Sequence, residues 1–206
     1  GTASTNQSFT IVVGDVNDAP TFTSTPGTAA TQDAVYTYNV TTEDIDGDDI
    51  NVSAPTSPDW LTFTPGATGS GTGILSGTPT NDDVGVHDVT IRVNDGTVDV
   101  DQVFQITVNN ENDPPTFTSI PVLTATQDVA YSYTAVAEDI DGNTLVYTAP
   151  VLPTWLTFTA ATQVLSGTPA NDDVGDTTVT IRVFDGTVSV DQAFFIEVAD
   201  VNDAPT

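Results

Sequence analysis

The sequence predicts an all-β protein built from two tandem antiparallel β-sandwiches of about seven short strands each. Three observations lead to this prediction: an internal repeat, apolar residues that alternate with polar ones, and clusters of Gly, Pro, Asn and Asp between the alternating runs. Alternation with a period of two is typical of strands that bury one face, and the clusters supply the turns. Apolar residues do not recur with the helical period of 3.6 residues, so almost no helix is expected.

The repeat runs through the whole sequence. Pro20 and Pro115 open the same phrase, PTFTS, and DVNDAPT at 200–206 begins a third copy, so each repeat has about 90 to 95 residues. The length difference lies in one loop, which spans 64–74 in the first repeat and 159–164 in the second. We therefore predict four segments: the last strand of a preceding repeat plus a linker at 1–19, a first repeat at 20–112, a second at 113–203, and the start of a further repeat at 204–206.

Each repeat contains strand-sized runs of the alternating pattern. They lie at 36–40, 50–52, 89–93 and 104–108 in the first repeat, and at 131–135, 145–147 and 179–183 in the second. Residues 1–13 align with 96–108 and with 186–198, and Phe9, Ile11 and Val13 alternate as a last strand should. We expect residues 8–13 to pair with the edge of a neighbouring molecule or to lie loosely over the first repeat.

Composition excludes several classes of function. The chain has 29 acidic residues, two Arg and no Lys, and its net charge is −27. Such a chain is repelled by phosphate, so nucleic acid and anionic membrane surfaces are excluded as partners. The absence of Cys and Met excludes disulfides, zinc-thiolate sites and thiol nucleophiles, and no apolar run is long enough for membrane insertion. The richness in Thr, Val, Asp and Gly suits an extracellular, secreted or cell-surface bacterial protein.

Aspartates are concentrated at the turns of the strand pattern. Asp44-Ile-Asp46-Gly47 in the first repeat corresponds to Asp139-Ile-Asp141-Gly142 in the second, and similar acidic clusters lie in the linkers. Alternate carboxylates followed by Gly let a tight turn direct two side chains at one point. Calcium requires six to eight oxygen ligands, so these turns predict Ca²⁺ as the partner of the chain.

These motifs resemble those of cadherin repeats. The DVNDAP linker, the turn at Asp44 and Asp46, and the Asp95-Gly96 pair match the linker, DxD and terminal Asp motifs of that family, in the same order in both repeats. The phrases around Trp60 and Leu75 resemble the dystroglycan-type cadherin-like and immunoglobulin-like repeats of long secreted bacterial adhesins. Where cadherins have an LDRE motif, this chain has Asn81-Asp82-Asp83. The resemblance implies a Greek-key sandwich fold and calcium ions between consecutive repeats.

The resemblance also implies a ligand set. At the complete junction the ligands would be Asp33, Asp82, Asp83, Asn110, Glu111, Asn112, Asp113, Asp139, Asp141 and Asp185. The same positions at the two outer linkers are Asn17, Asp18, Asp44, Asp46 and Asp95 at the N-terminal end, and Asp128, Asp172, Asp173 and Asp203 at the C-terminal end. The seven Asp carboxylates at the junction balance about three Ca²⁺ ions and repel one another without them. The resemblance thus implies a calcium-rigidified extender segment of a bacterial cell-surface adhesin.

Other functions remain open or are excluded. His87 is the single His, the second repeat has Thr177 at the equivalent position, and there is no Cys. The sequence therefore shows no catalytic constellation, and the chain is not expected to be an enzyme. Trp60 and Trp155 are expected to be core residues, although an aromatic platform for sugar is the alternative. The repeats are therefore expected to contact neighbouring repeats of the same chain, with polysaccharide binding or homophilic adhesion to identical repeats as the second hypothesis.

Overall fold

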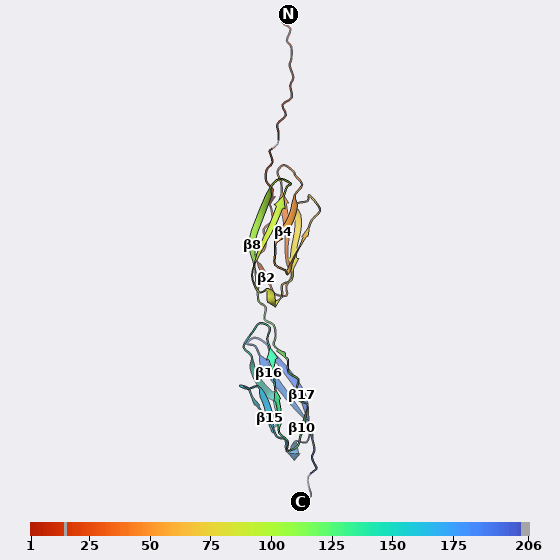
Figure 1. Cartoon of the computed structure of the whole chain (residues 1–206), viewed down its shortest axis with the longest axis vertical. Helices are drawn as coiled ribbons and strands as arrows, with labels where there is room; N and C mark the ends of the chain where they lie inside the picture. The colour runs from red at the N-terminus through yellow and green to blue at the C-terminus, as the bar shows by residue number, and fades with distance from the viewer. Residues whose placement is uncertain (15, 203–206) are drawn as a thin grey trace. The chain divides into compact units, whose positions relative to one another are not determined.

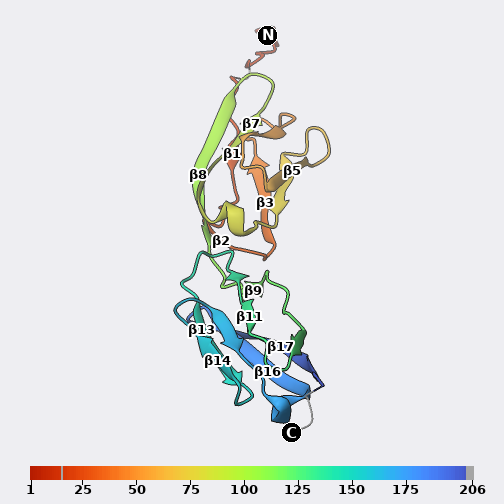
Figure 2. The ribbon, with the colours of Figure 1, turned by 60° about the horizontal axis from the view of Figure 1, so that its bottom comes forward.

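The computed structural model describes residues 1–14 and 16–202, and the chain divides into two compact units, Gly1–Glu111 and Asn112–Thr206. Each unit is a β-sandwich, and the two appear with their strands labelled in Figures 1 and 2. The all-β fold predicted from the sequence is confirmed. In the described residues helix is limited to two 3-10 turns of three residues each. None of these described helices is long and apolar enough to span a bilayer.

Unit 1 consists of two four-stranded sheets. Its elements are β1 (Thr21–Phe22), β2 (Ala29–Thr31), β3 (Tyr36–Glu43), β4 (Asn51–Thr56), β5 (Leu61–Pro65), β6 (Thr72–Gly77), the 3-10 turn η1 (Asn81–Asp83), β7 (Gly85–Asn94) and β8 (Asp99–Asn109). One sheet has the order β1-β3-β6-β5 and the other β2-β8-β7-β4. Figure 1 labels β2, β4 and β8 of the second sheet, and Figure 2 also labels β3 and β5 of the first.

Unit 2 repeats this arrangement with one interruption. Its elements are β9 (Thr116–Phe117), β10 (Thr124–Thr126), β11 (Tyr131–Thr134), β12 (Ala137–Glu138), β13 (Val146–Val151), β14 (Leu156–Thr159), β15 (Val164–Gly167), the 3-10 turn η2 (Asn171–Asp173), β16 (Gly175–Phe184) and β17 (Ser189–Ala199). The strand that is continuous as β3 in unit 1 is divided here into β11, which pairs with β15, and β12, which pairs with β9. The other sheet has the order β10-β17-β16-β13.

The core of each unit lies between the two layers of its sandwich. The alternating residues of β7 and β8 face inward, and Val89, Ile91 and Ile106 are fully buried. Their counterparts Val179, Ile181 and Ile196 are fully buried in unit 2. The period-two runs of the sequence therefore correspond to the inward faces of the long strands, as predicted.

The short strands differ from the sequence-based prediction. β2 runs parallel to β8, and β10 runs parallel to β17, whereas only antiparallel pairs were expected. Each of these strands has three residues, and β1 and β9 have two. Segments of two or three residues are too short to show an alternating apolar pattern. The sequence therefore did not predict these strands, and each unit has more strands than the seven expected.

The first 14 residues form no strand. Phe9 is 77% exposed, Ile11 73% and Val13 86%. The alternating apolar face predicted for this segment is therefore open to solvent rather than packed on unit 1.

Candidate metal centre

The turn after β3 gathers carboxylates through its own backbone. Oδ1 of Asp44 accepts hydrogen bonds from the backbone N–H groups of Asp46 (2.9 Å) and Asp48 (3.4 Å). This is the local bonding through which Asp side chains shape turns, and Gly47 completes the turn at φ +78°, a backbone region that favours Gly. One carboxylate oxygen of Asp44 thus organises the loop, which leaves the other available to a ligand.

Three carboxylates of this turn lie close enough to share one ion. Asp44, Asp46 and Asp48 each offer an oxygen, and these oxygens lie within 4.8 Å of one another. Oδ2 of Asp44 is buried and has no hydrogen-bond partner among the described residues. A buried carboxylate oxygen without a donor is costly, and a cation removes that cost. Asp48 was not included in the ligand set expected from the sequence.

Asp95 lies in the turn between β7 and β8 of the other sheet and is bonded to the segment that precedes β1. It is only 8% exposed, and its Oδ1 accepts the backbone N–H groups of Thr97 and Val98, both at 2.6 Å. Its Oδ2 accepts the side-chain amide of Asn17 at 3.0 Å. The Asn17 hydrogen bond, followed by those from Val98 and Thr97, lowers the pKa of Asp95 below its usual value. This carboxylate is therefore held ionised.

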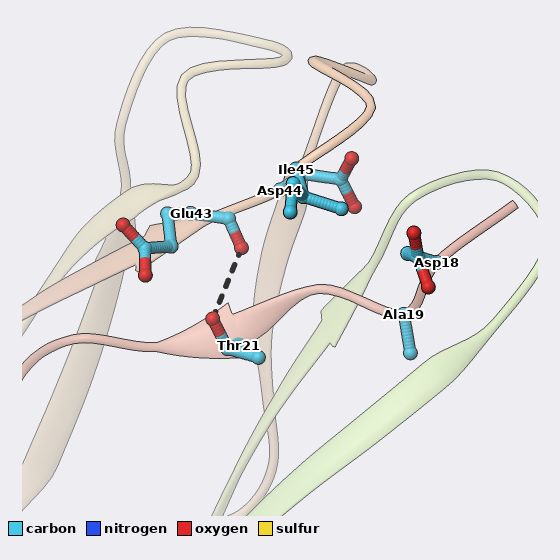
Figure 3. A pocket seen from close by; sticks show the side chains of 6 residues that line it. All are labelled: Asp18, Ala19, Thr21, Glu43, Asp44 and Ile45. Atoms are coloured by element: carbon cyan, nitrogen blue, oxygen red, sulfur yellow. Dashed lines mark hydrogen bonds between the residues drawn. The ribbon is translucent and has the colours of Figure 1, made fainter.

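The segment before β1 is held against the same turn. The backbone N–H of Asp18 donates to Oδ2 of Asp46 at 2.6 Å. A hollow of about 510 Å³ lies beside this contact, and Figure 3 shows Asp18 and Asp44 on the two chain segments that border it. In that view the hydroxyl of Thr21 bonds the carbonyl of Glu43, while the Glu43 carboxylate points away from Asp18. Asn17, Asp18, Asp44, Asp46 and Asp95 are thus brought together, and we refer to these five residues as the unit 1 DxD cluster.

Unit 2 has the same arrangement, built from Asn112, Asp113, Asp139, Asp141 and Asp185, which we call the unit 2 DxD cluster. Oδ1 of Asp139 accepts from the backbone N–H groups of Asp141 (3.0 Å) and Asn143 (3.2 Å). The backbone N–H of Asp113 donates to Oδ2 of Asp141 at 2.7 Å. Two buried carboxylate oxygens here have no partner among the described residues, Oδ2 of Asp139 and Oδ1 of Asp141.

Asp185 anchors the linker of unit 2 as Asp95 anchors that of unit 1. It is 6% exposed, and its Oδ2 accepts the side-chain amide of Asn112 at 3.0 Å. This bond, followed by the one from the Val188 backbone N–H, lowers the pKa of Asp185 below its usual value. Asn143 replaces Asp48 of unit 1 and donates to Oδ1 of Asn112 at 3.3 Å. The turn of unit 2 therefore has one carboxylate fewer than the turn of unit 1.

The opposite end of each unit carries a second acidic group. In unit 1, Asp33 adopts φ +58° and its backbone N–H donates to the carbonyl of Pro79, next to η1. Asp82 is exposed, whereas Oδ2 of Asp83 accepts both the backbone N–H and the hydroxyl of Thr80 at 2.8 Å. These two bonds lower the pKa of Asp83 below its usual value. Asp33, Asp82 and Asp83 thus lie on adjoining loops.

Unit 2 repeats this end with small changes. Asp128 adopts φ +60°, and its backbone N–H donates to the carbonyl of Pro169. Asp172 is exposed, and Asp173 accepts the backbone N–H of Ala170 at 2.9 Å, without the hydroxyl that Thr80 supplies in unit 1. Asp203 lies outside the described residues.

Two buried glutamines link these loops to the linkers. Gln32 is 3% exposed, and its Oε1 accepts the backbone N–H of Glu111 at 3.4 Å, while its Nε2 donates to Asp33 at 3.4 Å. Gln127 is equally buried, and its Oε1 accepts the backbone N–H of Val201 at 3.3 Å. Asn110 and Glu111 follow β8 directly and are exposed. The ligand set expected from the sequence omitted both glutamines, although the repeated Thr-Gln-Asp phrase was a signal for them.

The tryptophans belong to the hydrophobic core, as expected. Trp60 packs edge-on against Tyr36 at 6.0 Å between ring centroids, and Trp155 packs edge-on against Tyr131 at 5.7 Å. Both are partly buried against the core clusters of their units. They therefore do not form exposed platforms for a sugar.

The fold defines tandem immunoglobulin-like β-sandwich repeats, and each repeat has an acidic turn. The sequence model described as "Putative Ig domain" matches residues 19–109 and 114–199, and the chain belongs to that family. No curated protein sequence matches the chain significantly.

Solved structures with a similar fold include two cadherins. The first two repeats of human protocadherin-24 are 18% identical over 90% of this chain and 100% of that one, with a TM-score of 0.55. Drosophila N-cadherin repeats 1 to 4 are 12% identical over 90% of this chain and 50% of that one, with a TM-score of 0.53. An endo-fucoidan hydrolase of glycoside hydrolase family 107 is 30% identical over 89% of this chain, with a TM-score of 0.42. This chain spans only 29% of the hydrolase, and a TM-score this low supports no transfer of its activity.

Proposed function

We propose that the chain is an extender segment of a large extracellular bacterial surface adhesin, in which calcium ions clamp the linker between consecutive repeats and make the segment stiff. The partners are then calcium and the neighbouring repeats of the same chain. The family membership and the two sandwiches support a structural or adhesive role. The calcium ions, the bacterial source and the extracellular location are proposed in addition.

The observation that carries the proposal is the set of buried carboxylate oxygens that have no hydrogen-bond partner in the part of the chain that the structure describes. Oδ2 of Asp44, Oδ2 of Asp139 and Oδ1 of Asp141 lie in the two DxD clusters, and the other oxygen of each Asp is held by backbone N–H groups. An all-oxygen set of carboxylates and amides fits calcium, which accepts six to eight oxygens at 2.3–2.6 Å in flexible geometry. Magnesium fits less well because it demands near-octahedral geometry and gives up its water reluctantly.

The hydrogen bonds that each unit makes to its own end of the linker support a clamp there. The backbone N–H of Glu111 is bonded to Gln32 in unit 1, whereas the side chain of Asn112, the next residue, is bonded to Asp185 in unit 2. No flexible spacer therefore separates the two units in sequence. Ions bound by the unit 2 DxD cluster together with Asp33, Asp82 and Asp83 would restrict rotation about the few bonds between them. Removing the ions would restore that rotation and leave the carboxylates to repel one another.

Calcium titration with a matched pair of variants tests the proposal. Wild type should bind Ca²⁺ in calorimetry, gain melting temperature in millimolar Ca²⁺, and change its radius of gyration in small-angle scattering when chelator is added. Asp139→Asn keeps an oxygen for the turn but loses the charge, so it should lose most of these effects. Asp200→Asn, at an exposed residue outside both DxD clusters, should retain them. A wild-type protein that neither gains stability nor stiffens in Ca²⁺ would contradict the proposal.

The alternative, polysaccharide binding, has one observation on its side. Phe184 is 37% exposed and Phe195 66% exposed on the outer face of β16 and β17. However, Phe184 pairs with Ser189 while Phe195 pairs with Thr178, which puts the two rings six residues apart along β16. At about 3.4 Å per residue this separates them by roughly 20 Å, too far for one continuous stacking platform. The extender function is therefore favoured.

A further inference from the structure

The two flanks of each DxD turn are joined by hydrogen bonds, and the two units make this contact with different groups. In unit 1 the turn lies between Thr42, near the end of β3, and Ile50, just before β4. Gly71 contacts both flanks. Its carbonyl accepts the hydroxyl of Thr42 at 2.7 Å, and its backbone N–H donates to the carbonyl of Ile50 at 3.0 Å. One residue of a neighbouring loop thus joins the two ends of the turn.

Gly71 belongs to the loop between β5 and β6, residues 66–71, where the first repeat is longer than the second. It adopts φ +64°, and a Cβ there would clash with the hydroxyl of Thr42 and come within 3.2 Å of Cδ1 of Ile50. Gly is therefore required at this place. Ser70 adds a parallel bridge to Ile50, which is only 5% exposed. The longer loop thus packs directly on the flanks of the turn.

Unit 2 has a shorter loop at this place and closes its turn with a tyrosine. Tyr147 of β13 is 6% exposed. Its hydroxyl accepts the backbone N–H of Ala137 at 2.9 Å and donates to the carbonyl of the same residue at 3.4 Å. Ala137 and Tyr147 correspond in sequence to Thr42 and Val52 of unit 1. The same two flanks are therefore joined by a side chain that the first repeat replaces with Val.

The strand pairing supports this equivalence. Tyr147 pairs with Val183, and Val52 pairs with Val93, so the two residues occupy the same position in equivalent strands. Val52 has no polar side-chain atom that could reach the opposite flank. In unit 1 the longer loop supplies the contact instead.

Both contacts lie close to the candidate ligands. Thr42 and Ala137 precede Asp44 and Asp139, the first Asp of each turn, by two residues. Oδ1 of each Asp holds its turn, and Oδ2 is buried with no hydrogen-bond partner among the residues that the structure covers. Fixing the strand before the Asp therefore fixes where this second oxygen lies.

We propose that Thr42 with Gly71 in unit 1, and Tyr147 in unit 2, are positioning residues of the two candidate metal centres. They hold the flanks of the DxD turn together and thereby set how strongly the turn binds Ca²⁺; the identity of this ion rests on the proposed function. Oxygen ligands that are already fixed lose less freedom when an ion binds, so affinity rises with the rigidity of the site. Groups that orient ligands without touching the metal commonly change its affinity by about 10- to 100-fold.

Variants that remove one hydroxyl test the proposal. Thr42→Val and Tyr147→Phe leave the shape of each side chain nearly unchanged. Ca²⁺ is titrated into the intact chain, and the NMR shifts of the Gly47 and Gly142 amides report the two turns separately. Thr42→Val should raise the Kd of the unit 1 turn about tenfold, and Tyr147→Phe should do the same for the unit 2 turn. In each variant the Kd of the other turn should stay within about twofold of wild type.

Matched controls remove a hydroxyl elsewhere. Tyr131→Phe deletes the hydroxyl of another buried Tyr, which donates to the carbonyl of Val122 at 2.7 Å, and Thr37→Val deletes an exposed hydroxyl on β3. Neither should change either Kd by more than about twofold. A general effect of lost hydroxyls would appear in these controls, whereas the proposed role affects only the turn beside the changed residue.

Exchanging the two kinds of contact supplies a second test. When the sequence of residues 159–164 replaces residues 64–74, Gly71 is lost and the unit 1 turn should bind Ca²⁺ at least about tenfold more weakly. Adding Thr42→Ala and Val52→Tyr, the residues of unit 2, should restore the Kd to within about threefold of wild type. A loss of folding or of affinity that the added Tyr does not repair would overturn the proposal.

The outcomes separate this proposal from the calcium clamp. If wild type binds Ca²⁺ and the Kd values of Thr42→Val and Tyr147→Phe are unchanged, the positioning role is overturned and the clamp stands. If wild type binds no Ca²⁺ in either turn, both are refuted. Amide exchange in chelator at Asp46 for Thr42→Val, and at Asp141 for Tyr147→Phe, should be about tenfold faster than in wild type. Unchanged exchange would show that other contacts hold the flanks and would also overturn the proposal.

Discussion

The backbone N–H of Asp113 donates to Oδ2 of Asp141 at 2.7 Å, and this bond joins the linker to the DxD turn of unit 2. Its counterpart in unit 1 joins Asp18 to Asp46 at 2.6 Å. In both units the second Asp of the turn therefore orders the chain segment that carries the next candidate ligands. The protein's own hydrogen bonds thus hold the residues of each candidate metal site in place.

Calcium binding should depend on charge at Asp139 rather than on the shape of its turn. Asp139→Asn retains an oxygen that can accept the N–H groups of Asp141 and Asn143. We expect little change in melting temperature in chelator, but loss of most of the gain that wild type shows in millimolar Ca²⁺. Asp139→Ala should lower the melting temperature in both conditions. Equal gains in Ca²⁺ for Asp139→Asn and wild type would exclude Asp139 as a ligand.

Stability in chelator should fall in acid, partly through Asp185. Its pKa in the folded protein lies below the unfolded value, chiefly because Asn112 donates to it. The ionised carboxylate therefore stabilises the fold above about pH 4, and this contribution is lost as the pH falls through the folded-state pKa. Asn112→Ala should be less stable than wild type at pH 7 and should lose less stability on going to pH 2. Urea unfolding at both pH values measures this.

Asn110→Ala is the matched control for that experiment, because Asn110 is exposed in the same linker. Its pH dependence should follow wild type. The same steep loss of stability in acid for Asn112→Ala and wild type would show that the Asn112 bond does not set the pKa of Asp185.

Trp155 should be essential to the stability of unit 2. It packs against Tyr131 and the core cluster, so Trp155→Ala is expected to cost about 3 to 5 kcal/mol of unfolding free energy. Phe195→Ala, at a residue 66% exposed, should cost far less. Binding to a polysaccharide array should be unaltered in either folded variant. Retained stability with lost sugar binding for Trp155→Ala would reverse the order of the two proposed functions.

Gln32 should hold the start of the linker to unit 1. Gln32→Ala leaves the backbone N–H of Glu111 without its acceptor and removes a buried side chain. We expect a loss of about 1 to 3 kcal/mol and faster amide exchange at Glu111. Gln105→Ala removes an exposed Gln of the same unit that bonds only Asp88 in the described contacts, and it should change neither quantity. Unchanged exchange at Glu111 in Gln32→Ala would show that the linker is held by other contacts.

Much of the fold could be read from the sequence because its signals are local and repeated. The alternation at Val89, Ile91 and Val93 is a property of neighbouring residues, and it recurs at Val179, Ile181 and Val183, so the buried faces could be predicted without knowing what they pack against. The Asp44-Ile-Asp46-Gly47 turn is equally local, since its hydrogen bonds span only two to four residues.

Tertiary structure decided the features that depend on distant residues. The contact of Gln32 with the backbone of Glu111 depends on the fold, because it joins residues 79 positions apart in the sequence. The short strands β2 and β10 exist because β8 and β17 offer them a free edge, and three residues carry no period of their own. Burial among neighbours likewise leaves one carboxylate oxygen each of Asp44, Asp139 and Asp141 without a hydrogen-bond partner among the residues that the structure describes. The sequence by itself determined which residues face inward and in which turns the carboxylates gather. Packing decided which of those carboxylate oxygens are buried away from a hydrogen-bond donor.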